Sequence, residues 1–109
     1  MTSIVIIRTR VEGFHVYKEA PEQVRFLNNL HRHIFHIALY IEVSHDNRER
    51  EIFIEKQKLE ERLHSEYGAI CNFGEQSCEM IAKKIIGWTD GAFACEVSED
   101  GEGGAIVYV

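Results

Sequence analysis

Apolar side chains stand at every second position through the middle of the chain. From residue 33 to residue 43 these alternate positions carry His33, Phe35, Ile37, Leu39, Ile41 and Val43. Successive side chains of a β-strand point to opposite faces, so a period of two places these residues on one face. The intervening positions include the polar residues His36 and Glu42. The pattern therefore predicts a one-sided strand that ends at the polar turn of residues 44–47.

Two later stretches are typical of α-helices. Residues 53–67 are rich in helix-forming side chains, and Leu59 and Leu63 lie four positions apart on one helical face. A second helix is predicted to begin after Ser77, whose hydroxyl suits an N-cap, and to end near Gly87. Its apolar stripe consists of Cys78, Ile81, Ala82, Ile85 and Ile86.

Three further segments are predicted as strands. The first covers Ser3–Arg10 and is rich in β-branched residues. The last two cover residues 92–97 and 105–109, joined by an acidic, glycine-rich hairpin over residues 98–104. The remaining connections are a long one over residues 17–30, with one helical turn around Pro21–Phe26, and a short loop through Asn72 and Gly74.

The predicted order of elements is β-β-α-α-β-β, within a single domain over residues 1–109. This order predicts an α+β fold, in which a four-stranded antiparallel sheet carries both helices on one face. Such a sheet leaves two exposed edges, and the apolar run Ile4–Ile7 would lie on one of them. Association of copies would cover these edges, so we expect a homo-oligomer.

The composition excludes several classes of protein. The formal net charge is -6, without a basic stripe that could neutralise phosphates, which argues against a nucleic-acid-binding surface. No apolar run is long enough to span a bilayer, and no signal-peptide pattern is seen, so we expect a soluble cytoplasmic protein without a membrane partner. The three cysteines, Cys71, Cys78 and Cys95, are expected to be buried reduced thiols.

Three histidines can reach one point in this arrangement. His31 and His33 are two positions apart, so both point to the same side of the strand that they open. His15 stands at the end of the first apolar run, and pairing of the two strands would bring its imidazole beside the other two. Three neutral imidazoles with an open fourth position are typical of a catalytic zinc site. A structural or surface role for the His-x-His pair is the alternative.

Four motifs resemble those of a known family, in the same order. Gly13-Phe14-His15 resembles its first zinc-ligand motif, and His31-Arg32-His33-Ile34-Phe35 resembles its His-Gly-His-Asn-Tyr motif. Ser77-Cys78-Glu79-Met80-Ile81-Ala82 resembles the start of its second helix, and Val97-Ser98-Glu99-Asp100 resembles its late Val-x-Glu-Thr motif. The family is that of the 6-pyruvoyl- and 6-carboxytetrahydropterin synthases, which have the T-fold. The resemblance covers nearly the whole chain.

The resemblance implies a role for each matched residue. His15, His31 and His33 would bind zinc. Glu99 would accept hydrogen bonds from the ring N–H and the exocyclic amine of a pterin- or purine-type ligand, as a carboxylate with two acceptor oxygens can. Glu79 is a second ligand-binding candidate. The alternatives are a solvated hairpin carboxylate for Glu99 and a favourable contact with the helix dipole for Glu79.

The chain departs from the family at the residues that move protons. Family members carry a catalytic cysteine before the His-x-His motif, and residues 16–30 contain none. They also carry an Asp-His pair after the first helix, whereas His64 follows Leu63. Arg32 stands where the family has glycine. The remaining catalytic candidates are His64 and His36, with Glu22 and Tyr17 as further ones.

Three functions therefore stay open. If it is an enzyme, the chain is a zinc-dependent carbon–oxygen lyase-type homologue of the tetrahydropterin synthases, acting on a pterin- or purine-type ligand with its usual reaction lost or altered. Alternatively, it is a non-catalytic protein of the same fold that senses or sequesters such a ligand. A structural oligomer module with a vestigial site is the third. The resemblance also implies that the homo-oligomer is built on trimers and reaches a hexamer.

Overall fold

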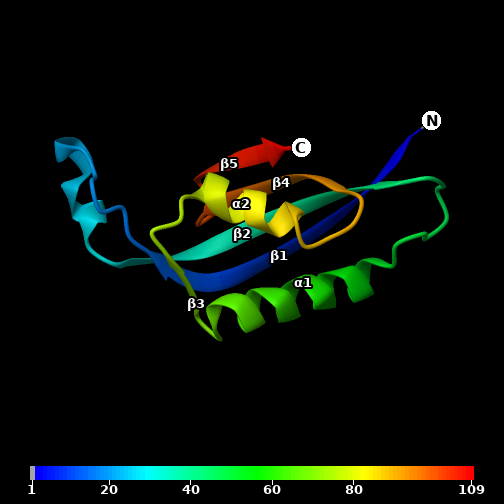
Figure 1. The fold of residues 1–109 in the computed structure, drawn as a ribbon, viewed down its shortest axis with the longest axis horizontal. Helices are drawn as coiled ribbons and strands as arrows, with labels where there is room; N and C mark the ends of the chain where they lie inside the picture. The colour runs from blue at the N-terminus through cyan, green and yellow to red at the C-terminus, as the bar shows by residue number, and fades with distance from the viewer. Residues whose placement is uncertain (1) are drawn as a thin grey trace.

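The computed structural model describes residues 2–109, which form one mixed β-sheet and three helical segments (Figure 1). The predicted α+β class is therefore confirmed. In chain order the elements are β1 (Ser3–His15), the 3-10 helix η1 (Glu22–Asn28), β2 (His31–Val43), α1 (Ile52–Tyr67), β3 (Cys71–Gly74), α2 (Cys78–Ile86), β4 (Ala92–Glu99) and β5 (Gly103–Tyr108).

The sheet has five strands in the order β3-β1-β2-β4-β5. β1 and β2 pair in antiparallel fashion along their whole length, from Ser3 opposite Val43 to His15 opposite His31. β4 and β5 continue the antiparallel arrangement beyond β2. This register brings the end of β1 beside the start of β2, which is where the predicted metal ligands lie.

The hydrophobic core lies on the sheet face that both α-helices cover. A single cluster of buried side chains joins the sheet to α1 and α2. Its central members are Ile7 and Val11 of β1, Phe35 and Ile37 of β2, Cys95 and Val97 of β4, Leu59 and Leu63 of α1, and Ile81 and Ile85 of α2. Burial of these apolar side chains is the main force that holds the helices on the sheet.

The two α-helices begin and end close to their predicted limits. Glu51 caps α1, because its carboxylate accepts a hydrogen bond from the Ile54 amide at 2.8 Å. Gly68 follows the last turn with a φ of +102°, a conformation that favours glycine. Ser77 caps α2 as predicted, because its Oγ accepts a hydrogen bond from the Met80 amide at 3.2 Å.

The prediction of a four-stranded, purely antiparallel sheet is wrong in one respect. Residues 71–74, predicted as a loop through Asn72 and Gly74, form the short strand β3, which pairs in parallel with the end of β1. Cys71 and Phe73 alternate with exposed or half-buried positions and are fully buried. A four-residue strand is too short for a period of two to stand out in the sequence, and its pairing depends on tertiary contact.

Other predicted limits change by a few residues. β1 continues to His15 instead of ending near Arg10, so the first predicted ligand lies on the strand itself. The helical turn predicted around Pro21–Phe26 is the longer 3-10 segment Glu22–Asn28, which is kinked at Val24. The last hairpin is tighter than predicted, with β4 reaching Glu99 before the turn. Among residues 2–109, no helix is long and apolar enough to cross a membrane.

Candidate metal centre

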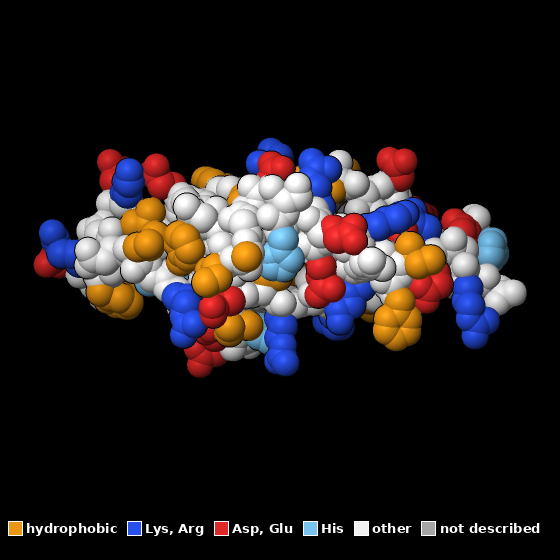
Figure 2. Space-filling model, turned by 90° about the horizontal axis from the view of Figure 1, so that it is seen from below, with side chains coloured by type: hydrophobic (Ala, Val, Ile, Leu, Met, Phe, Trp, Pro, Cys, Tyr) orange, Lys and Arg blue, Asp and Glu red, His pale blue; other side chains and the backbone are white. Residues whose placement is uncertain are grey.

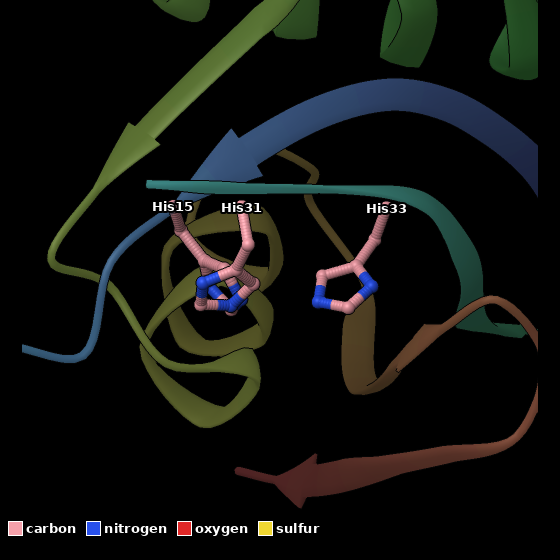
Figure 3. Close-up of side chains that lie close together, drawn as sticks. All are labelled: His15, His31 and His33. Carbon is pink, nitrogen blue, oxygen red and sulfur yellow. The ribbon is translucent and has the colours of Figure 1, made fainter. Parts of the chain in front are cut away.

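Three imidazoles converge at one end of the sheet, on its helix-covered face. His15 is the last residue of β1, and His31 and His33 lie on β2 opposite His15 and Gly13. Each histidine offers one ring nitrogen to a possible metal ion, and these three nitrogens lie within 4.8 Å of one another. Figure 3 shows the three rings hanging from the two strands toward the same space. The predicted convergence of the three histidines is therefore present in the structure.

Each ring is held from outside through its Nδ1 atom. The Nδ1 of His15 lies 3.0 Å from the Gln76 carbonyl oxygen, and that of His31 lies 2.9 Å from the Asn29 carbonyl oxygen. The Nδ1 of His33 lies 2.7 Å from the Asp100 carboxylate. All three partners are acceptors. In the neutral imidazoles the proton is therefore assigned to Nδ1, and Nε2 carries a free lone pair.

The inward nitrogens lack partners of their own. Within residues 2–109, the buried Nε2 atoms of His15 and His33 have no hydrogen-bond partner. Glu99 approaches both, with Oε2 at 3.0 Å from the His15 Nε2 and Oε1 at 3.5 Å from the His33 Nε2. Buried lone pairs that converge on one another are unfavourable unless a cation lies between them. The donor set therefore fits a metal ion such as zinc, for which neutral imidazole is a common ligand.

Burial sets the protonation of the most enclosed ring. His15 is only 7% exposed, and this burial lowers its pKa below the usual 6.5. The Gln76 carbonyl and the Glu99 carboxylate act in the opposite direction, and the neighbouring imidazoles lower the pKa further. A lowered pKa keeps the ring neutral at physiological pH, which is the form that binds a metal.

Asp100 fixes the third ring from the turn between β4 and β5. Its Oδ1 accepts a hydrogen bond from the Ile34 amide at 2.9 Å, and its own amide donates to the Ile34 carbonyl at 2.8 Å. The hydrogen bond from the Ile34 amide is the main cause that lowers the pKa of the Asp100 carboxyl, and the hydrogen bond with His33 is the second. Asp100 has a φ of +58°, which aspartate tolerates better than most residues. The sequence analysis gave Asp100 no role, although its place beside Glu99 in a hairpin was a usable signal.

A cavity of about 240 Å³ opens beside the histidines. Both carboxylates predicted to bind a ligand, Glu99 and Glu79, line this cavity. Its other lining residues include His15, Tyr17, Leu27, His31, Gln76, Cys78 and Gly103. The arrangement places the histidine cluster, two carboxylates and an apolar rim around one small space, which is typical of a ligand site.

Cys78 belongs to this site, which the sequence analysis missed. It is the first residue of α2, and its Sγ lies 3.8 Å from the Glu99 carboxylate. Burial, followed by the charge of Glu99, raises the pKa of this thiol to about 12. Cys71 and Cys95 lie in the core, and all three cysteines are buried and free. The expectation of buried reduced thiols is therefore confirmed.

The two proposed catalytic histidines lie away from the triad. His36 pairs with Arg10 and Ser98 and points to the opposite face of the sheet from His33. His64 is exposed in the last turn of α1, where its Nδ1 lies 3.0 Å from the Gly68 carbonyl oxygen. Neither is brought to the cluster. Of the further candidates, Tyr17 lines the cavity, whereas Glu22 forms an ion pair with Arg25 in η1.

A larger cleft of about 660 Å³ lies between α1 and the segment after α2. Two of its cationic side chains already have partners. Arg50 pairs with Glu55 at 2.9 Å, and the Arg62 guanidinium lies over the Trp88 ring at 4.9 Å. This cleft holds none of the histidines of the cluster, so we place the candidate site at the smaller cavity.

Comparison with protein-family models gives no match for this chain, and comparison with curated proteins gives none either. The geometry of the site itself therefore carries the functional argument.

Proposed function

We propose that this chain has a T-fold, binds zinc through His15, His31 and His33, and acts on a pterin- or purine-type ligand in the adjacent cavity. The observation that carries the proposal is the orientation of the three rings. Each Nδ1 faces an outer acceptor, so the remaining ring nitrogens face one another. Three imidazoles suit zinc and leave its fourth coordination position open. Bound zinc would polarise an oxygen atom of the small molecule in the cavity.

Glu99 is the carboxylate that we assign to the ligand ring. It lines the cavity, its side chain is 34% exposed, and it lies within 3.0 Å of the His15 ring. A ring bound to its two oxygens would therefore stand next to the metal cluster. Parallel N–H groups of a pterin or guanine-type ring match a carboxylate in this way. Glu79 lies in the first turn of α2, where its charge also interacts favourably with the helix dipole.

A non-catalytic binding protein of the same fold is the second candidate. The observation that favours it is the placement of the proton-transfer candidates. His36 and His64 lie away from the cavity, and the Cys78 thiol, with its pKa raised to about 12, stays protonated. Positioned acid and base groups are needed for elimination or rearrangement chemistry. A sensing or sequestering role requires the metal and Glu99 alone.

The sheet supports association of copies of this chain. β3 pairs only with residues 13–15 of β1, and the rest of that edge is open in the described structure, as is the outer edge of β5. The sheet face away from the helices exposes Ile4, Ile6, Ile106 and Tyr108. Exposed edges and apolar residues of this kind favour strand pairing between copies. We therefore propose that the chain forms a homo-oligomer; that it is built on trimers is what the family resemblance implies.

The face seen in Figure 2 carries charges of both signs. Lys, Arg, Asp and Glu side chains are interspersed along it, with apolar groups between them, and they form no continuous basic stripe there. Sedimentation at micromolar concentration tests the oligomer, and a monomer there would contradict it.

Metal content and turnover test the function. We expect one zinc per chain by elemental analysis, lost in His31→Ala and kept in the control His45→Ala, which changes an exposed histidine of the 44–47 turn. The zinc-loaded protein is then incubated with neopterin and with guanosine and analysed by mass spectrometry. Recovery of bound but unchanged compound identifies a binding protein, and conversion identifies an enzyme. Absence of zinc from the wild-type chain would overturn both.

A further inference from the structure

We infer that Glu99 is the fourth ligand to the metal in the ligand-free protein, so that the ring and the metal compete for one carboxylate. The inference rests on the proposed metal site and adds a means of control to it. The site is closed by Glu99 when the cavity is empty. It opens when a ligand ring draws the carboxylate away with its N–H groups.

Glu99 and the inner nitrogens of two rings face one another as acceptors. Gln76 and Asp100 present acceptors to the outer nitrogens of His15 and His33, so the single proton of each neutral ring lies there. The inner Nε2 atoms then have no proton to donate to Glu99. Nevertheless the carboxylate lies 3.0 and 3.5 Å from these two atoms. Acceptors facing acceptors at this range need a cation between them, and a metal ion supplies it for all of them at once.

The distances from Glu99 to two of the rings are those between neighbouring ligands of a metal ion. A tetrahedral zinc shell with bonds near 2.0–2.1 Å places its ligand atoms about 3.3 Å apart. The separations of the Glu99 oxygens from the two Nε2 atoms, 3.0 and 3.5 Å, lie on either side of this value. One oxygen faces His15 and the other faces His33. The carboxylate therefore lies at the spacing of a metal ligand from two of the three imidazoles.

The backbone of Glu99 is held by two neighbouring strands. It is the last residue of β4, paired with Phe35 of β2 and with Gly103 of β5. The next residue, Asp100, fastens the turn to Ile34 and to the His33 ring. Adjacent residues of one hairpin thus provide the fourth ligand and the support of the third. Because the backbone is fixed on both sides, Glu99 reaches the metal or the cavity by side-chain rotation alone.

The carboxylate also remains accessible to a ligand. Its side chain is 34% exposed, and the Cys78 thiol donates a weak hydrogen bond to Oε2 at 3.8 Å. A ring whose N–H groups replace this weak contact with two charge-assisted hydrogen bonds would compete with the metal for the carboxylate. Binding of the ring would therefore also free the fourth coordination position of the metal.

The test uses the full chain loaded with zinc or with cobalt(II), whose visible bands report the ligand set. For Glu99→Gln we expect zinc affinity, measured by competition with a chelator, to fall about 10- to 100-fold. Millimolar azide should shift the cobalt bands of this variant and leave those of the wild type unchanged. The control is Glu96→Gln, on the opposite face of the same strand. It should match the wild type.

A second variant separates ligation from charge. Glu99→Asp keeps the charge but shortens the side chain, so direct ligation predicts weaker zinc binding in both Glu99 variants. An effect of charge alone predicts weaker binding in Glu99→Gln only, and that result would overturn the inference. Wild-type affinity and cobalt bands in both variants would overturn it as well, while the three-histidine site stands. Failure of the wild type to bind metal would overturn the site and the inference together.

Discussion

His33 and Asp100 lie 67 positions apart in the sequence, yet the His33 Nδ1 stands 2.7 Å from the Asp100 carboxylate. The same carboxylate accepts a hydrogen bond from the Ile34 amide, so it contacts both the His33 ring and the backbone of β2. A carboxylate behind a metal-ligating histidine fixes the orientation of the ring and raises its basicity. The β4–β5 turn is thus part of the candidate metal centre.

Asp100→Asn tests this support. Asparagine also tolerates a positive φ, so the turn should keep its shape while the negative charge behind His33 is lost. We expect zinc affinity to fall by about 10- to 100-fold, as for other partners of metal-bound histidines. Chelator competition measures it, with Asp46→Asn in the exposed 44–47 turn as control. Equal affinity of Asp100→Asn and wild type would contradict a role for the carboxylate.

Removal of the metal should lower stability. A ligand that binds only the folded state adds about 2.7 kcal/mol when its free concentration is 100 times its Kd. We therefore expect EDTA to lower the Tm of the wild-type chain and to leave that of His31→Ala unchanged. Differential scanning calorimetry measures both. A Tm of the wild type that does not respond to EDTA would count against a bound metal.

The metal-free protein should lose stability as the pH falls below neutral. Burial lowers the pKa of His15 in the folded chain, whereas in the unfolded chain it returns to about 6.5. Below pH 6.5 the His15 ring is protonated in the unfolded state but stays neutral in the folded state. The free energy of unfolding therefore decreases as the pH falls from 6.5 to the lowered pKa of the folded state. His15→Gln cannot titrate and should show a smaller loss. Urea unfolding in EDTA between about pH 7.5 and pH 5 gives the comparison; equal losses would exclude His15 as a source.

The close approach of β3 to β1 gives a stability prediction. A Cβ at Gly13 would lie 2.8 Å from the Phe73 ring and 2.9 Å from the Cys71 carbonyl oxygen. Gly13→Ala should therefore cost about 1–3 kcal/mol, the range for overpacking a filled core. Gly103→Ala is the matched control, since a Cβ there meets no described atom within 4 Å. Equal urea midpoints for the two variants would show that β3 does not pack as described.

The thiols should be unreactive in the folded protein. The pKa values of Cys71, Cys78 and Cys95 are raised to about 11, 12 and 12 by burial. Because the thiolate is the reactive form, iodoacetamide at about pH 8 should label the folded chain slowly and the urea-unfolded chain at all three positions. Mass spectrometry counts the labels. Rapid labelling of Cys78 alone would reveal an opening of the cavity that the structure does not contain.

The histidine cluster was predictable because it rests on local geometry. A period of two fixes the common direction of His31 and His33, and antiparallel pairing of neighbouring strands brings His15 to them. The helices were predictable for a similar reason, since the cap Ser77 and the apolar spacing of Leu59 and Leu63 are local signals.

What the sequence did not reveal depends on contacts between distant segments. β3 is a strand because Cys71 and Phe73 pack beside Gly13, and its own residues Asn72 and Gly74 resemble a loop. The role of Asp100 depends on the turn that carries it back to β2. In each case the partner is far along the chain, so no pattern of neighbouring residues contains the information.

The three acceptors behind the histidines bear on the order of folding. Asn29 precedes β2, Gln76 lies 61 positions from the ring it holds, and Asp100 lies 67 positions from its own. The β1–β2 hairpin alone would supply the imidazoles without two of their three supports. Contacts of such long range close late, because their loops must first be ordered. Uptake of cobalt into a coloured, fully supported site by a refolding chain should therefore mark the completion of tertiary structure.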